Sequence, residues 1–418
     1  MTDKKSKNKD NHICSFCNKN KAENPELVFV TAGPAATICN ECVDLSVDIV
    51  KQEKASKAPV KSDVLPKHTP RKIKDFLSEY VIGQDKTKKT LAIAVYNHYH
   101  RLNLIMNGKG DNVLKKSNIL MIGSTGSGKT HTLSTLARLL DVPFAIADAT
   151  TITEAGYVGD DAENIIARLI ENAGGDVEKA QKGIVYIDEI DKIARKGEST
   201  SITRDVSGEG VQHALLKLIE GTVCSVVAQG VRKSSGQPAT TFDTSNVLFI
   251  CGGAFDGLPK IISARTEDKG SIGFNAPVSS SKKEDASYEL LSKIETQDLI
   301  KFGLVPELIG RLPIITTLQD LDKQALKNIL TEPKDALVKQ YQTLFSTHDV
   351  DLSFTEDALD AIAQEAINKK TGARGLRSII ERVLEDFMFD MPEMEKGSKV
   401  EINEAIVKGS NPLQMKVA

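Results

Sequence analysis

The sequence predicts an α/β fold in which a parallel sheet is flanked by helices, with a small, mainly helical C-terminal domain and a cysteine-containing N-terminal module. Between about residues 68 and 317, apolar runs of strand length alternate with helical patterns, an order typical of a parallel sheet. From residue 318 onward helical patterns prevail, and four of the six cysteines lie within the first 42 residues. Since a hydrophobic core stops growing at about 250–300 residues, a chain of 418 residues is expected to form several domains.

The cysteines near the N-terminus form two CxxC pairs, Cys14 with Cys17 and Cys39 with Cys42. In a reducing compartment two such pairs indicate a tetrahedral S₄ site that suits Zn²⁺; two unrelated redox pairs are the alternative. With four protein ligands the site is closed, so we expect a structural role. The metal ion would supply most of the folding free energy of so small a module.

The domain boundaries follow from changes in composition. Residues 51–70 are rich in Lys, Ser and Pro and show neither helical nor strand periodicity, which is typical of a flexible tether. We expect a disordered tail, a zinc-binding module, a linker, a large domain and a small domain at residues 1–10, 11–55, 56–67, 68–317 and 318–418.

Overall composition is that of an ordinary soluble protein, with 40% hydrophobic and 27% charged residues. The formal net charge of −3 provides no basic field that would attract nucleic acid or an anionic membrane, so neither is an expected partner. No apolar stretch reaches the ~18 residues of a membrane span, and the polar start MTDKKSKNKD lacks the apolar run of a secretory signal. A cytoplasmic location is expected.

The strongest motif is NILMIGSTGSGKT, in which an apolar run precedes a glycine-rich loop and a helical pattern. This is the P-loop pattern: backbone N–H groups cradle phosphate oxygens, and the helix presents its positive end to the anion. Lys129 is expected to reach the β- and γ-phosphates, and Thr130 to hold Mg²⁺. The predicted nucleotide-binding loop consists of Gly123, Ser124, Thr125, Gly126, Ser127, Gly128, Lys129 and Thr130.

A second apolar run, in GIVYIDEID, ends in two carboxylates. Asp188 is placed to bind the Mg²⁺ shell, and Glu189 can polarise a water molecule for attack on the γ-phosphate. An acidic loop after a core strand is the alternative, but beside a P-loop the pair predicts an enzyme that binds and hydrolyses ATP.

These motifs and a later GARGLR resemble the AAA+ ATPases. The chain resembles the ClpX family from about Cys14 to its end. The further segments that carry this resemblance are the four-cysteine module, GYVG, TRDVSGEGVQHALLKLIEGT, GSIGF and LVPELIGRLP. The resemblance implies a homo-hexameric ring that acts as an ATP-driven unfoldase and chaperone. The ring would bind protein substrates and adaptor proteins and thread substrates into the ClpP peptidase ring, without itself being a peptidase.

The resemblance also assigns two pore loops. GYVG places Tyr157 and Val158 between two glycines that give freedom at the loop's ends; this loop would press on an extended polypeptide by steric contact. Arg204 and Val206 belong to the second loop, which precedes an amphipathic helical pattern. The alternatives are a plain surface turn for the first loop and a helix-capping loop for the second.

Two further loops resemble contact sites of the family. Ile272, Gly273 and Phe274 form an apolar triplet within a long polar stretch, which resembles the segment that anchors in a groove of the ClpP ring; a triplet folded onto its own domain is the alternative. The Arg232-Lys233-Ser234 loop has Ser where the family has His at the pore entrance, so the sequence leaves its capture of substrate tags open.

Two arginines and an apolar pair complete the expected ATP site. Arg311 resembles the arginine finger that reaches a neighbour's γ-phosphate, and Arg374 resembles the sensor that joins the small domain to the nucleotide; surface ion pairs are the alternative for both. Val81 and Ile82 correspond to the family's adenine pocket. The sequence does not assign the polar sensor expected after the NVLFICGG strand.

Two other functions deserve comparison. A nucleic-acid motor would need basic pore loops or a helix-turn-helix appendage, whereas this chain has an aromatic pore-loop motif and a net charge of −3. A non-catalytic adaptor would need a degenerate ATP site, whereas Lys129, Asp188 and Glu189 are all present.

Overall fold

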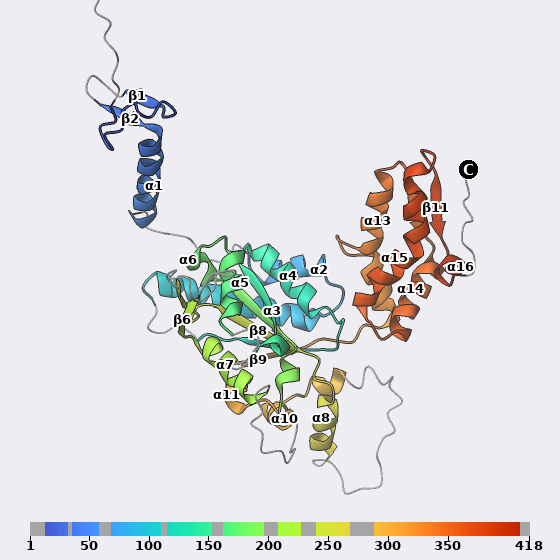
Figure 1. Ribbon diagram of the computed structural model, residues 1–418. Helices are drawn as coiled ribbons and strands as arrows, with labels where there is room; N and C mark the ends of the chain where they lie inside the picture. The colour runs from blue at the N-terminus through green and yellow to red at the C-terminus, as the bar shows by residue number, and fades with distance from the viewer. Residues whose placement is uncertain are drawn as a thin grey trace, which may run out of the picture. The chain divides into compact units, whose positions relative to one another are not determined.

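The computed structural model describes residues 13–31, 36–57, 68–109, 115–152, 162–195, 208–226, 240–267 and 288–409 (Figure 1). The chain divides into two compact units, Met1–Asp63 and Val64–Ala418. Each unit is described by itself. Among the described residues, no helix has both the length and the apolar character that crossing a membrane requires.

The first unit is a two-stranded antiparallel sheet followed by one helix. Strands β1 (Phe29–Thr31) and β2 (Thr37–Cys39) pair, and α1 (Asn40–Lys57) begins directly after β2. Its buried apolar core consists of Cys14, Leu27 and Cys39, which is too small to stabilise a fold without cross-links or metal.

The predicted absence of helix from residue 51 is wrong, because α1 continues to Lys57. Residues 51–57 read KQEKASK and contain no Gly or Pro. Lys, Gln, Glu and Ala are strong helix formers, so a helix can extend through this segment without an amphipathic pattern.

The second unit contains a five-stranded sheet whose neighbouring strands all pair in parallel, as the sequence predicts. The strand order is β4-β5-β8-β3-β9. In an open parallel sheet, ligands bind beyond the carboxyl ends of the strands, where connections diverge to opposite sides. The strands are β3 (Ile119–Ile122), β4 (Phe144–Asp148), β5 (Ile184–Asp188), β8 (Leu248–Gly253) and β9 (Ile314–Thr317).

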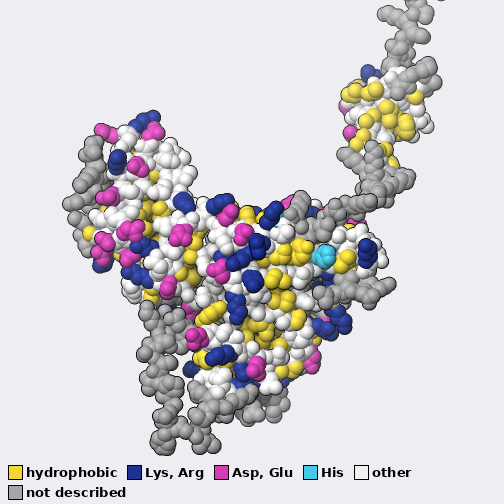
Figure 2. All heavy atoms as spheres, turned by 180° about the vertical axis from the view of Figure 1, so that it is seen from behind, with side chains coloured by type: hydrophobic (Ala, Val, Ile, Leu, Met, Phe, Trp, Pro, Cys, Tyr) yellow, Lys and Arg dark blue, Asp and Glu magenta, His cyan; other side chains and the backbone are white. Residues whose placement is uncertain are grey.

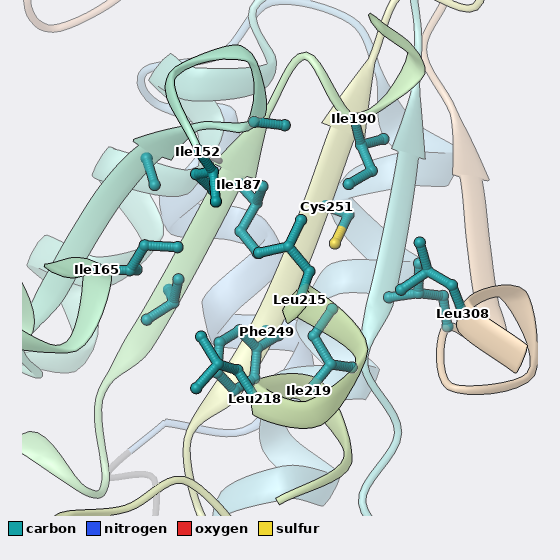
Figure 3. Close-up of a cluster of buried hydrophobic side chains, with 14 of the residues drawn as sticks. Ile152, Ile165, Ile187, Ile190, Leu215, Leu218, Ile219, Phe249, Cys251 and Leu308 are labelled. Carbon is teal, nitrogen blue, oxygen red and sulfur yellow. The ribbon is translucent and has the colours of Figure 1, made fainter. Parts of the chain in front are cut away.

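Hydrophobic clusters cover both faces of the sheet. On one face Val185, Ile187, Phe249 and Cys251 pack with the helices that follow β4 and β5 (Figure 3). On the other, the alternate strand residues pack with the N-terminal helices. The helices of the first face are α5 (Asn164–Asn172), α7 (Glu209–Glu220), α8 (Leu258–Glu267) and α11 (Pro306–Gly310); those of the second are α2 (Pro70–Ser78), α3 (Asp85–Met106) and α4 (Lys129–Leu140).

Shorter elements join these layers. Strands β6 (Val223–Val226) and β7 (Thr240–Asp243) form a separate antiparallel pair. Short helices lie at η2 (Ala149–Thr151), α6 (Val177–Ala180), η3 (Ile190–Ile193) and α10 (Thr296–Phe302).

A separate hydrophobic core begins at Leu321, whereas Leu318 still packs with the sheet. The face of α15 that the sequence predicts to be buried, which includes Leu376, Ile380 and Leu384, lies in this core. The elements are α12 (Lys323–Thr331), α13 (Leu337–Ser346), β10 (Asp351–Phe354), α14 (Glu356–Asn368), α15 (Ala373–Asp390), η4 (Met391–Glu393), β11 (Lys399–Ile402) and α16 (Glu404–Val407). Strands β10 and β11 pair in parallel.

The chain leaving β9 is fastened to the start of α3. Gln84 precedes α3 and is buried; its amide Nε2 donates to Gln319 O at 2.8 Å, and its Oε1 accepts from Gln319 N at 2.8 Å. Thr87 Oγ1 also donates to Thr317 O at 3.1 Å. Residues 317 and 319 are therefore fixed to the sheet domain, just before the chain enters the helical core at Leu321.

Asn118 connects three parts of the sheet domain through a buried amide. Its Oδ1 accepts from Phe249 N at 3.2 Å, and its Nδ2 donates to Arg311 O at 3.0 Å. We expect Asn118→Ala to lower the free energy of unfolding by about 2–4 kcal/mol, because it leaves two backbone groups unpaired. Urea unfolding measures the change. Asn107→Ala, at an exposed helix end, should stay within about 0.5 kcal/mol; equal effects would contradict this role.

Candidate functional site

The predicted phosphate-binding loop joins the end of β3 to the start of α4, at the carboxyl edge of the sheet. Gly126 and Gly128 have φ values of +82° and +95°, a region that residues with a side chain adopt only with strain. The first turn of α4 therefore follows the loop without a side-chain cap, since Gly128 is its N-cap residue. Its free N–H groups can bind an anion.

Lys129 is buried and bends back over the loop. Its Nζ donates to Gly123 O at 2.6 Å and to Ser124 O at 3.0 Å. Burial lowers the pKa of Lys129; Arg374 acts in the same direction, and Asp188 opposes both. The ammonium group is thus held against two carbonyl groups of the loop, near the positive charge of Arg374 and the negative charge of Asp188.

The two residues predicted to hold Mg²⁺ lie together. Thr130 Oγ1 donates to Asp188 Oδ2 at 3.3 Å, although 58 positions separate them in the sequence. They meet because α4 and β5 both reach the carboxyl edge of the sheet. A hydroxyl and a carboxylate are hard oxygen ligands, and Mg²⁺ is commonly held by few protein oxygens together with phosphate oxygens and water. The donor set therefore fits Mg²⁺.

Glu189 follows in an unusual backbone conformation. Its φ of +58° lies in the left-handed region, which a residue with a side chain enters at a cost and which is often found at active sites. Its N–H donates to Asp188 Oδ1 at 3.0 Å, and its side chain is exposed. The carboxylate of Asp188 is thereby oriented, while that of Glu189 remains open to water.

A cavity of about 490 Å³ lies beside the loop and extends to the helices after residue 321. Val81, Ile82 and Arg374 line it together with Gly126–Thr130. Ala373 N donates to Gly126 O at 3.4 Å, so the turn before α15 contacts the loop directly. The structure thus brings the predicted adenine pair, phosphate loop and Arg374 to one pocket.

The first unit places the four predicted zinc ligands together. The sulfur atoms of Cys14, Cys17, Cys39 and Cys42 all lie within 4.8 Å of one another, which fits a tetrahedral S₄ site. Burial alone would raise the pKa of the Cys14 thiol, but N–H groups of Cys17, Cys39 and Phe16 outweigh it and lower the pKa to about 6. The backbone therefore favours the thiolate that a metal ion requires.

The family model of the AAA domain (Cdc48 subfamily) matches residues 114–315, and that of the C-terminal D2-small domain of ClpB protein matches residues 321–402. The ClpX C4-type zinc finger matches residues 12–52. A relative from Treponema denticola, the ATP-dependent Clp protease ATP-binding subunit ClpX, is 52% identical over 402 residues, 96% of this chain and 94% of the relative.

The chain belongs to the ClpX family. The resemblance inferred from the motifs is thereby confirmed, as are the predicted AAA+ fold, with its small C-terminal domain and cysteine module, and the ATPase activity. ATP, Mg²⁺ and Zn²⁺ are accordingly the cofactors of this ClpX-family protein.

Arg311 differs from Arg374 because it does not line the cavity. It ends α11, is exposed, and its Nε donates to Glu220 Oε1 at 2.8 Å. Its carbonyl oxygen is held by Asn118. The guanidinium group therefore lies at the surface in an ion pair with Glu220, which is the alternative considered for this residue. Its role as the finger of a neighbouring subunit stays a prediction.

Several residues of the cavity are absent from the sequence-based prediction. Arg377 lies one helical turn after Arg374 on α15, and this three-residue spacing is a signal that could have identified it. Three other missed lining residues adjoin predicted ones, since Tyr80 precedes Val81, His131 follows Thr130 and Ala373 precedes Arg374 in GARGLR. The remaining ones come from distant segments and carry no motif: Leu321, Ile329, Pro333, Asp335, Leu337 and Gln340.

The predicted loops for substrate and partner lie outside the residues that the structure describes. These are Tyr157, Val158, Arg204, Val206, the Arg232-Lys233-Ser234 loop, and Ile272, Gly273 and Phe274. The helix predicted after the second pore loop is α7, whose Val211, Leu215 and Leu218 are buried.

Zinc removal should affect the first unit alone. We expect chelation to unfold residues 13–57 because the unit's apolar core is small and structural zinc contributes about 10–16 kcal/mol in comparable modules. Circular dichroism and alkylation of the four cysteines would report the loss. The thermal midpoint of the Val64–Ala418 unit should not change.

Cys39→Ser should lower zinc content well below one ion per chain, whereas Cys224→Ser, outside the cluster, should leave it at one. Equal zinc content in the two variants would contradict the assignment.

Proposed function

We propose that this chain is the ATP-driven unfoldase and translocase of a Clp protease and that it works as a homo-hexameric ring. The observation that carries the proposal is the common pocket of the phosphate loop, Val81, Ile82 and Arg374, from which Arg311 is excluded. A pocket that holds Arg374 but lacks Arg311 suits a ring in which each ATP lies between neighbouring subunits and receives Arg311 from the next one. The relative's printed role, ATP-binding subunit of a Clp protease, supports the same assignment.

The predicted site residues in and around the pocket have proposed roles in hydrolysis. Backbone N–H groups of the loop and Lys129 bind the phosphates, and Thr130 and Asp188 hold Mg²⁺, which neutralises charge on the phosphate oxygens when bound. Glu189 accepts a proton from the attacking water, whose oxygen bonds to the γ-phosphorus. The bond between the γ-phosphorus and the oxygen that bridges it to the β-phosphate breaks, and ADP and phosphate leave. Arg311 of the next subunit stabilises the charge that develops during transfer.

Coupling to motion follows from the contact between the loop and α15. Arg374 and Ala373 lie at the start of α15, whose buried face belongs to the helical core, while Gly126 lies in the phosphate loop. A nucleotide that binds both parts stabilises one angle between them, and its loss of the γ-phosphate removes part of that stabilisation. We propose that this change moves Tyr157 and Val158 of one pore loop, and Arg204 and Val206 of the other, along the pore.

Partner contacts are assigned to two regions. We propose that Ile272, Gly273 and Phe274 anchor in the ClpP peptidase ring, and that the zinc unit receives adaptor proteins and substrates. In Figure 2, hydrophobic side chains gather on the visible face of the zinc unit. The large hydrophobic residues exposed in the described part of this unit include Phe16, Val28, Val30 and Leu45. Exposed apolar surface of this kind suits protein partners. We also propose that the protein acts in the cytoplasm without nucleic acid.

Degradation of a tagged, folded protein by this chain with ClpP and ATP tests the proposal. Tyr157→Ala should abolish degradation while ATP hydrolysis continues, because the loop loses its bulk, whereas Tyr157→Phe should preserve both activities. Stimulation of ATP hydrolysis by substrate protein, and not by DNA, is also expected. Normal degradation by Tyr157→Ala would overturn the pore-loop assignment.

A further inference from the structure

Tyr186 is a buried tyrosine whose hydroxyl group has no hydrogen-bond partner among the described residues. It lies in the middle of β5, two positions before Asp188, with none of its surface exposed. Its side chain belongs to the apolar cluster that contains Ile184, Leu248 and Ile250. A phenylalanine would fill this space without burying an unpaired polar atom, whereas the hydroxyl costs stability in the structure as it stands.

The ring of Tyr186 leans across the neighbouring strand toward the carboxyl edge of the sheet. In the β5–β8 register Tyr186 is paired with Ile250, two residues before Gly252. A Cβ atom added at Gly252 would lie 2.8 Å from Cε2 and 2.9 Å from Cζ of the Tyr186 ring, and closer still to its hydroxyl. Gly252 thus leaves the opening through which the phenol reaches this edge.

The polar neighbours of the phenol are the two residues assigned to Mg²⁺. Burial, followed by the Asp188 carboxylate, raises the pKa of Tyr186, while the Thr130 hydroxyl opposes these effects. Thr130 Oγ1 already donates to Asp188 Oδ2 at 3.3 Å. Asp188 lies two positions after Tyr186 on β5, so both side chains project from the same face of the strand. The phenol therefore stands beside this pair, and its hydroxyl forms no hydrogen bond of good geometry with the described residues.

We propose that Tyr186 is a positioning residue for ATP hydrolysis, and that its hydroxyl donates a hydrogen bond to the oxygen shell of the Mg²⁺ that Thr130 and Asp188 hold. The acceptor would be a water or phosphate oxygen of that shell. Strand β8 ends in Cys251, Gly252 and Gly253 and supplies no polar side chain here. The phenol of the adjacent strand takes that position. The inference rests on the proposed assignment of Thr130 and Asp188.

Binding of a fluorescent ADP analogue to the full chain, titrated with Mg²⁺, tests the inference without depending on hydrolysis. Tyr186→Phe should raise the Mg²⁺ concentration at half-maximal binding about tenfold, since a hydrogen bond to a charged group is lost. Binding of the analogue in the absence of Mg²⁺ should not change. The thermal midpoint of the nucleotide-free variant should equal or exceed that of the parent, because an unpaired hydroxyl has been removed.

Tyr99→Phe is the matched control. Tyr99 belongs to the same apolar cluster, but its hydroxyl donates to Lys182 O at 3.0 Å. This variant should have a lower thermal midpoint and an unchanged Mg²⁺ requirement, the reverse of Tyr186→Phe. A Mg²⁺ requirement of Tyr186→Phe within twofold of the parent would overturn the inference.

Asp188→Asn separates the two levels of the argument. A raised Mg²⁺ requirement in Asp188→Asn, with none in Tyr186→Phe, would overturn the role of Tyr186 alone. An unchanged requirement in Asp188→Asn would instead overturn the proposed magnesium site, and the inference with it.

Discussion

Glu189→Gln is expected to reduce kcat for ATP hydrolysis by about 10²–10⁴-fold, the usual contribution of a general base. Glutamine has nearly the same shape but cannot accept the proton of the attacking water. ATP binding should persist, because Glu189 does not line the cavity. The substitution also leaves unaffected the 3.0 Å hydrogen bond that the backbone N–H of Glu189 donates to Asp188 Oδ1. Phosphate release and equilibrium ATP binding, measured on the same preparation, separate the two effects.

Glu178→Gln provides the control, since Glu178 is an exposed carboxylate on α6. Its hydrolysis rate should equal that of the parent. If Glu189→Gln retained kcat within twofold of the parent, another group would have to accept the proton, and the assigned mechanism would fail.

Arg311→Ala is expected to reduce kcat by about 10³–10⁵-fold, the contribution of an arginine finger in related phosphoryl-transfer enzymes. The ion pair with Glu220 is exposed, so its loss should change stability by less than about 1 kcal/mol. ATP binding by each chain should persist because Arg311 lies outside the chain's own cavity. Arg382→Ala, which breaks another exposed pair at 2.7 Å, should leave hydrolysis unchanged.

Mixing the two inactive variants tests whether Arg311 acts on a neighbour. In a mixed ring, a Glu189→Gln subunit can supply its intact Arg311 to the site of an Arg311→Ala subunit, which retains Glu189. Such sites contain both groups, so the mixture should hydrolyse ATP well above either variant alone. A mixture as inactive as its components, in rings shown to exchange subunits, would contradict action between subunits.

The fold could be predicted from the sequence where local pattern and burial agree. Strands β3 and β5 are short apolar runs buried on both faces, and each ends in a motif that marks the edge of the sheet. The helical face of α15 follows from its 3, 4, 7 spacing. The extension of α1 to Lys57 could not be predicted from periodicity, because its propensity for helix is not expressed as an amphipathic pattern.

The candidate site could be predicted only as far as its motifs reach. Lys129, Asp188 and Arg374 each lie in a short motif that predicts their role without knowledge of the residues that the fold brings next to them. Leu337, which begins α13, and Pro333, in the connection between α12 and α13, line the cavity because the fold brings them to the loop. No local pattern encodes that approach. The role inferred for Tyr186 depends on a hydroxyl group without a hydrogen-bond partner among the described residues and on the space beside Gly252. Neither feature can be predicted from the sequence of the strand.

The two bonds between Gln84 and Gln319 determine where a lever can bend. Hydrogen bonds hold residues 317 and 319 to the sheet domain, and Leu321 already packs with the helical core. The backbone that can rotate between the two domains at this connection therefore spans one or two peptide units. In the motion proposed above, so short a connection would transmit torque between the two domains with little slack, and the displacement of a residue would grow with its distance from this connection.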